Sequence, residues 1–197
     1  MINLQLPSEP LSGTHLRLTR FVDADAGELF RSLDHDEVWA HVAGRRCSSE
    51  QYLLDLARAP ENGRYPWVLR LQHELAGLPA GAVVGTSSYL DFVASDERCE
   101  IGFTSYSPAV WGSVVNPEAK LLLLEAAFAA GIGRVQLKTD IRNLRSQRAI
   151  AGIGATREGA LRKYQRRDDG SMRDTVMFSV LVDEWPEVRQ GLIRRTA

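Results

Sequence analysis

The sequence has little cysteine and almost no net charge, and each shortage excludes a class of protein. Its 197 residues include only two cysteines, Cys47 and Cys99, without metal-ligand spacing. A disulfide framework is therefore not expected, and both thiols should be reduced, as in the cytoplasm. The formal net charge is -1. No basic field is therefore present to attract nucleic acid or a membrane surface.

Long apolar runs are also missing. No uninterrupted stretch reaches the roughly 20 apolar residues that span a bilayer. The opening residues, MINLQLPSEP, lack the basic segment followed by an apolar one that marks a secretory signal. The length, with 44% hydrophobic and 25% charged residues, suits one domain with its own core. We expect a cytoplasmic protein with a single domain over residues 1–197.

Several chemical signatures are absent as well. The four histidines show no metal-ligand spacing, so no metal site is expected. The segment GTSSY at 85–89 does not match the Gly-x-Ser-x-Gly turn of many hydrolases. In GIGATREG at 152–159 the third glycine comes too late for a dinucleotide fingerprint.

The pattern that is present alternates strands and helices. Alternation of apolar and polar residues in HLRLTRF predicts a strand, and helical spacing with an Asp cap candidate predicts a helix in DADAGELFRSL. We expect strands at 15–21, 65–72, 82–92, 98–106 and 134–140, helices at 23–33, 48–59, 117–133 and 143–154, and a closing hairpin of 159–167 and 171–182. This order predicts an α/β (α+β) fold, a mixed sheet with helices on its faces.

The segment WGSVVNPEAK, 111–120, reads as a loop that leads into the clearest helix of the chain. Asn116 can cap this helix and Pro117 suits its first turn. The first amides of a helix lack internal partners and carry partial positive charge, so they can bind phosphate. Gly112 and Ser113 could add further amides. The alternative is an ordinary tight loop before a buried helix.

Four segments in order resemble the GNAT superfamily of acetyltransferases, and more closely its ribosomal-protein-alanine (Rim-type) branch. They are LSGTHLRLTRF, EIGFTSYSPAVWGSVVNPEAKLLLLEAAF, RVQLKTDIRNLRSQRAIAGIGATREGALR and DGSMRDTVMFSVLVDEW. The resemblance implies a GNAT-like, mostly antiparallel sheet flanked by helices on both faces. It also implies transfer of an acetyl group from acetyl-CoA to a primary amine by direct attack.

The resemblance implies the residues that bind the cofactor. They are Phe103, Thr104, Ser105 and Tyr106 along the pantetheine arm, Gly112, Ser113, Val114, Val115 and Asn116 around the pyrophosphate, and Asn143. Val114 departs from the family, which usually has glycine there. A positive φ at Val114 would cost about 1–2 kcal/mol, whereas micromolar affinity corresponds to about 8 kcal/mol. A clash of the Val114 Cβ with the pyrophosphate is avoided if Val114 takes a negative φ, and we expect the loop to bind.

Two residues are candidates for the chemistry. Glu100, near the start of its strand, could take the proton of the attacking amine; the alternative is a solvated strand-end glutamate. Asn143 and Ser146 share one helix face, and the alternative is an N-cap asparagine beside a surface serine. The resemblance implies that Ser146 donates a hydrogen bond to the leaving sulfur. Many family members have a tyrosine for this at the position of Ile150.

The acceptor is poorly specified. Trp39 follows the first helix and resembles an aromatic residue that often lines the acceptor cleft of this branch, although a core tryptophan is an equal alternative. A peptide or protein N-terminus and a small-molecule amine both remain open, as does a homodimer. The rival function is a non-catalytic acyl-CoA-binding or interaction protein on the same scaffold.

Overall fold

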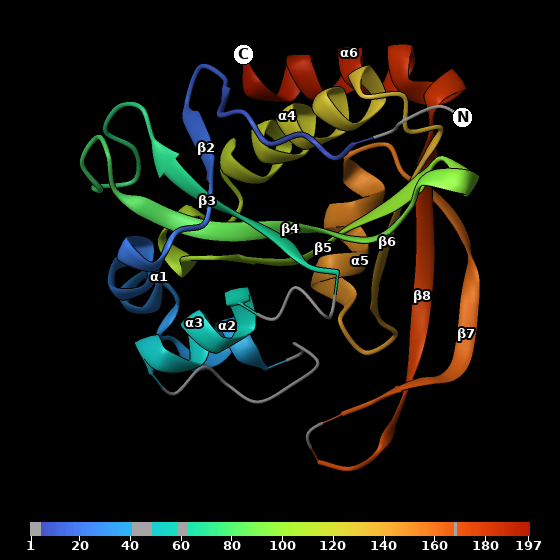
Figure 1. Cartoon of the computed structure of the whole chain (residues 1–197), viewed down its shortest axis with the longest axis horizontal. Helices are drawn as coiled ribbons and strands as arrows, with labels where there is room; N and C mark the ends of the chain where they lie inside the picture. Colours follow the sequence, from blue (N-terminus) through green and yellow to red (C-terminus); the bar gives the residue numbers. More distant parts are fainter. Residues whose placement is uncertain (1–4, 41–48, 59–62, 168) are drawn as a thin grey trace.

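The computed structural model describes residues 5–40, 49–58, 63–167 and 169–197, which excludes Cys47. Its centre is an eight-stranded sheet in the order β1-β2-β3-β4-β5-β6-β8-β7 (Figure 1). The strands are β1 Leu11–Ser12, β2 Leu16–Arg20, β3 Tyr65–Leu71, β4 Val83–Val93, β5 Arg98–Tyr106, β6 Arg134–Asp140, β7 Thr156–Arg166 and β8 Met172–Leu181. Only β5 and β6 pair in parallel, so the mixed, mostly antiparallel sheet is confirmed.

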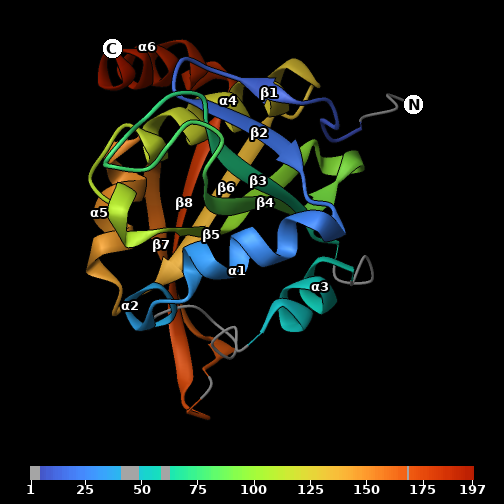
Figure 2. The same cartoon turned by 90° about the vertical axis from the view of Figure 1, so that its left-hand side faces the viewer.

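Helices cover both faces of this sheet (Figures 1 and 2). On one face lie α4, Val115–Ala129, and α6, Trp185–Thr196; on the other lie α1, Ala26–Leu33, α2, Asp36–Trp39, and α3, Glu50–Arg58. The remaining helix, α5, spans Leu144–Gly152 and follows β6. The larger core cluster joins the sheet to α4 and α6, and a smaller one packs α1 and α3 against β3 and β4. No helix of the described residues is long and apolar enough to cross a membrane.

The central parallel pair is short, and this positions the site. Pairing of β5 with β6 covers only Arg98 to Glu100, although β5 continues to Tyr106. Beyond Glu100, β5 also carries a bulge: Phe103 and Thr104 lie opposite the single residue Ser87 of β4. Phe103 has a φ of 45°, which a non-glycine residue rarely adopts. The backbone is therefore distorted at the point where the two strands part.

The predicted elements are confirmed, but β1, α2 and α6 were not predicted. Helix α6 was missed because it is mostly polar, and only Val188 and Leu192 of it are buried. Two apolar positions give too weak a period to predict a helix from sequence. The start of α4 was also misplaced: the helix begins at Val115, so Asn116 lies inside its first turn and is not its cap.

Candidate functional site

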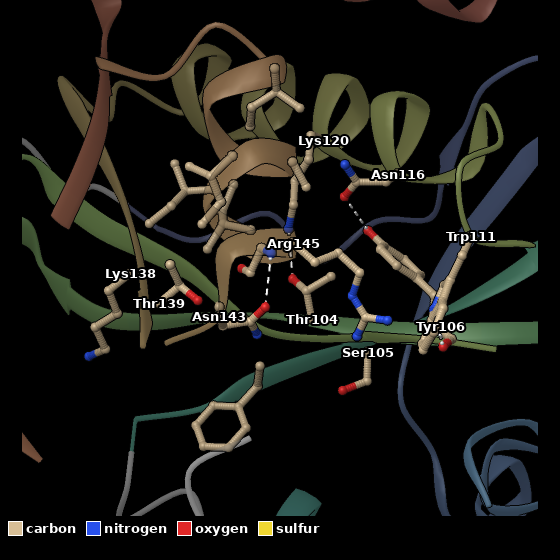
Figure 3. Close-up of a pocket in the computed structure, with 18 of the residues that line it drawn as sticks. Thr104, Ser105, Tyr106, Trp111, Asn116, Lys120, Lys138, Thr139, Asn143 and Arg145 are labelled. Atoms are coloured by element: carbon tan, nitrogen blue, oxygen red, sulfur yellow. Dashed lines mark hydrogen bonds between the residues drawn. The ribbon is translucent and has the colours of Figure 1, made fainter. Parts of the chain in front are cut away.

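A cavity of about 350 Å³ lies where β5 and β6 part (Figure 3). Its walls come from β5, β6, the loop before α4, the first turns of α4, α5, and the paired strands β7 and β8. Most of the predicted site residues meet here: Glu100, Phe103, Thr104, Ser105, Tyr106, Gly112, Ser113, Asn116, Asn143 and Ser146. Predicted residues up to 46 positions apart in the sequence, from Glu100 to Ser146, thus border one space.

The loop before α4 and the first turn of the helix contain amides without a protein partner. Among the described residues, no hydrogen-bond acceptor faces the amides of Gly112, Val114 and Asn116. Gly112 has a φ of 75°, and a Cβ added there would meet no atom within 4 Å. Amides without a protein partner at a helix start can bind an anion.

Val114 does not strain this loop. Its φ is -67°, in the right-handed helical region, so the glycine usual in the family is not needed for backbone conformation. The Val115 side chain is fully buried in the main core. Neither valine lines the cavity, so the structure does not bring Val114 and Val115 to it with the other predicted residues.

A small network fixes the loop from the side of β5. The Tyr106 hydroxyl donates to Asn116 Oδ1 at 3.1 Å, and the Trp111 indole N–H donates to the Tyr106 carbonyl at 3.0 Å. Burial raises the pKa of Tyr106, which keeps the phenol neutral. The Arg145 guanidinium lies 3.7 Å from the centre of the Trp111 ring (Figure 3). A cation therefore lines the same cavity as Gly112 and Asn116.

Glu100 is not a solvated strand-end residue. It is only 2% exposed and is the third residue of β5. Its carboxylate pairs with Lys138 Nζ at 2.7 Å and accepts from Gln136 Nε2 at 3.4 Å. Burial raises the pKa of Glu100, and the nearby Lys138 ammonium opposes this shift. Glu100 is thus a buried carboxylate whose affinity for a proton exceeds that of an ordinary glutamate.

Sequence reasoning missed Lys120 of α4. Its side chain is 4% exposed, and its Nζ donates to Thr104 Oγ1 at 2.7 Å and to Ser87 Oγ at 3.2 Å, which places it against the bulge of β5 (Figure 3). Burial lowers the pKa of Lys120 to about 7, with the Glu100 charge opposing the shift. The available signal was a lone lysine in the otherwise apolar run AKLLLL.

The buried Lys120 should make stability depend on pH. The pKa of this lysine is about 7 in the folded chain against 10.5 for an ordinary lysine. Between these values the unfolded chain holds a proton that the folded chain lacks, so the free energy of unfolding rises with pH. We expect the stability of the wild type to rise relative to Lys120→Met from pH 7 to about pH 10. Urea titrations across this range measure it, with Lys163→Met, at an exposed lysine, as the control for the removal of a lysine charge. A constant difference for Lys120→Met would contradict the shifted pKa.

Helix α5 carries Asn143 and Ser146 to the cavity. The Asn143 side chain caps the helix, because its Oδ1 accepts from the Ser146 amide at 3.0 Å. The Ser146 hydroxyl makes no hydrogen bond to any other described residue. Ile150 also lines the cavity, so this wall offers no tyrosine. The local capping role of Asn143 is present, and both side chains still border the cavity.

Trp39 lies differently from the other predicted residues. Its indole N–H donates to the Leu33 carbonyl at 2.7 Å, and its ring packs against the core cluster under α1. The neighbouring Val38, rather than Trp39, lines the cavity. Its proposed contact with an acceptor remains a prediction. In the described part of the chain, no three His, Cys, Asp or Glu residues are grouped to hold a metal ion.

Comparison with known proteins agrees with this geometry. The family model of the acetyltransferase (GNAT) domain matches residues 15–156, well over half of the chain. A candidate acetyltransferase from T. thermophilus is 36% identical, with a TM-score of 0.83 over 98% of this chain and 99% of that one. The uncharacterized N-acetyltransferase p20 of Bacillus licheniformis is 25% identical over 68% of this chain and 71% of its own length.

The fold is also similar to that of Mycobacterium smegmatis RimJ, a protein whose structure contains CoA-disulfide. The two share 20% identity and a TM-score of 0.74 over 94% of this chain and 92% of RimJ. The match over residues 15–156 decides the family. The chain therefore belongs to the GNAT acetyltransferases and is an acetyl-CoA-dependent N-acetyltransferase.

Proposed function

We propose that this acetyltransferase transfers the acetyl group within the cavity between β5 and β6, by direct attack of a primary amine on the thioester. One observation carries the proposal. The amides of Gly112 and Asn116 have no partner among the described residues, and both residues line the same cavity as the buried Glu100. Acetyl transfer from a diphosphate-containing donor needs a loop that binds the diphosphate and a base that accepts the proton of the amine, both at one cavity.

The loop before α4 fits the diphosphate of acetyl-CoA. Its amides would donate to phosphate oxygens, with the partial positive charge of the helix start adding to the attraction. Gly112 allows close approach, since it has no side chain to keep an anion away. Arg145 would add a full positive charge beside them. The pantetheine arm would then follow Phe103 to Tyr106, where β5 no longer pairs with β6.

Glu100 would accept the proton of the attacking amine. Its raised pKa improves it as a base, while the Lys138 ammonium opposes the shift and so favours the ionised carboxylate. The demand is modest for a peptide N-terminus, because an α-amino group has a pKa of about 8. The amides near Thr104 and Ser105 would stabilise the charge that develops on the carbonyl oxygen.

Ser146 would donate to the leaving sulfur, since its hydroxyl borders the cavity and has no other partner among the described residues. We expect Ser146→Ala to lower kcat by roughly three- to tenfold, the value of one hydrogen bond. The affinity for acetyl-CoA should change far less. Steady-state kinetics with a calorimetric titration separates the two effects. An unchanged kcat would remove Ser146 from the mechanism.

The acceptor that we favour is a peptide or protein N-terminus, which is supported by the likeness of fold to RimJ and by the low pKa of α-amines. A small-molecule amine is the second candidate.

We also infer that residues 1–197 act as one domain in the cytoplasm. The rival, a protein that binds acyl-CoA without catalysis, is favoured by the absence of a tyrosine at Ile150.

Release of free thiol tests the proposal against its rival. The purified protein is incubated with acetyl-CoA and a panel of peptides and small amines, and the thiol is followed with time. We expect release above the hydrolysis background with at least one amine. Tight acetyl-CoA binding without release across the panel would favour the non-catalytic rival.

A further inference from the structure

One face of the neighbouring strands β5, β6 and β8 carries three charged residues that line the cavity: Glu100, Lys138 and Arg173. Paired residues of neighbouring strands point to the same face, and β6 pairs with β8 so that Lys138 lies opposite Met177 and Asp140 opposite Thr175. Arg173, two residues before Thr175, shares this face with Glu100 and Lys138. The opposite face of the same strands carries buried apolar residues of the main core.

The charges on this face do not balance. Glu100 pairs with Lys138 at 2.7 Å, and Asp140 is held by Arg167, also at 2.7 Å. Each carboxylate thus has its cation. Arg173 is left over: it is 6% exposed, its Nε donates to Thr175 Oγ1 at 3.0 Å, and no carboxylate of the described residues lies within ion-pair distance.

A buried arginine without a direct ion-pair partner is costly, because a guanidinium stays protonated and loses its hydration. Burial lowers the pKa of Arg173, although the charges of Asp140 and Glu100 oppose the shift. Arg173 nevertheless borders the cavity, so the rest of its guanidinium can meet a ligand. Its fork of donors matches a carboxylate or phosphate, which it can hold through two parallel hydrogen bonds.

A second unsatisfied group lies beside it. Gln165 of β7 is paired with Arg173 in the sheet and also lines the cavity. Its Oε1 is buried and has no hydrogen-bond donor among the described residues. An acceptor for N–H groups thus stands next to a donor for an anion. An amine that carries an anionic group would satisfy both.

We propose that Arg173 is the anion-binding residue of the acceptor site, so the acceptor is an amine that carries a carboxylate or phosphate a few bonds from its nitrogen. The proposal rests on the proposed function, since it needs Glu100 and the thioester in the same cavity. The amine would lie near Glu100 and Gln165, with its anionic group on Arg173. An amino acid, an acidic peptide N-terminus and a phosphorylated amine share this chemistry.

Matched acceptor pairs test the proposal. An amino acid is compared with its amide, a peptide with an acidic second residue with its neutral analogue, and phosphoethanolamine with ethanolamine. We expect kcat/KM to favour the anionic member of at least one pair by roughly 10- to 100-fold, as for hydrogen bonds to charged groups. The pair with the largest ratio identifies the source of the anion. Equal or higher rates with all the neutral members would overturn the proposal.

Variants of Arg173 link the preference to this side chain. In Arg173→Met the ratio should fall toward one, and Arg173→Lys should restore part of it. Arg173→Glu should instead favour diamines, which keeps the test informative if the methionine variant folds poorly. Arg162→Met, at an exposed arginine of β7 outside the cavity, is the matched control and should keep the wild-type ratio. A ratio that persists in Arg173→Met would contradict the assignment.

The two proposals fail in different ways. Thiol release with neutral amines alone would contradict the role of Arg173 and leave the proposed acetyl transfer intact. No thiol release with any amine would contradict both proposals.

Discussion

Replacing Glu100 with glutamine is expected to lower kcat/KM by roughly 100- to 1,000-fold, the usual value of a general base. Glutamine keeps the size of the side chain but cannot accept the proton of the amine. Because burial raises the pKa of Glu100, wild-type activity should fall on acidification at a pH above the ordinary glutamate value of 4.5. The part of this pH dependence that comes from Glu100 should disappear in Glu100→Gln. The part that comes from deprotonation of the acceptor ammonium should remain. Steady-state kinetics from pH 5 to pH 9 measures both effects.

Glu118 offers a matched control for this change. It is also 2% exposed, but it lies outside the cavity, where its carboxylate accepts from the amides of Thr14 and His15. Glu118→Gln should therefore lower stability and leave kcat/KM nearly unchanged. If the two variants lose activity to the same extent, the loss reflects damage to the fold, and Glu100 is not the base.

Replacing Gly112 with alanine is expected to weaken acetyl-CoA binding by roughly 10- to 100-fold, the value of one charge-assisted hydrogen bond. The new Cβ would project into open space beside the amides, where a phosphate must approach. The left-handed backbone adds a folding penalty of about 1–2 kcal/mol. Calorimetric titration with acetyl-CoA measures the affinity, and urea unfolding measures the penalty.

Gly77 separates these two effects. Its φ is 76° against 75° at Gly112, and an added Cβ there also meets no atom within 4 Å. Gly77 does not line the cavity. Gly77→Ala should therefore lose similar stability and keep full affinity for acetyl-CoA. Equal affinities in the two variants would show that Gly112 has no part in binding.

Local pattern was sufficient for most of the fold. The period of the residues in PEAKLLLLEAAFAAGIG predicted α4, and the alternation in RCEIGFTSY predicted β5, because each segment buries one side or both. Helix α6 was not predicted, because Val188 and Leu192 are its only buried residues. The start of α4 was predicted two residues too late. Asn116 was predicted as the N-cap, but it lies inside the helix and its side chain accepts a hydrogen bond from Tyr106.

The site was harder to predict than the fold. Glu100, Asn143 and Ser146 were chosen from the family resemblance, and they do border one cavity. Lys120 and Arg173 were not, because their importance comes from burial and from missing partners, which depend on strands distant in the sequence. The conformation of Val114 likewise depends on the loop as a whole. The sequence could not decide whether Val114 takes a strained positive φ, and in the structure its φ is negative.

The structure of the protein with coenzyme A bound is the most direct test of the account. We expect the diphosphate oxygens within hydrogen-bond distance of the Gly112, Val114 and Asn116 amides, and the sulfur between β5 and α5, near Ser146. A coenzyme bound elsewhere, with these amides occupied by protein groups, would contradict it.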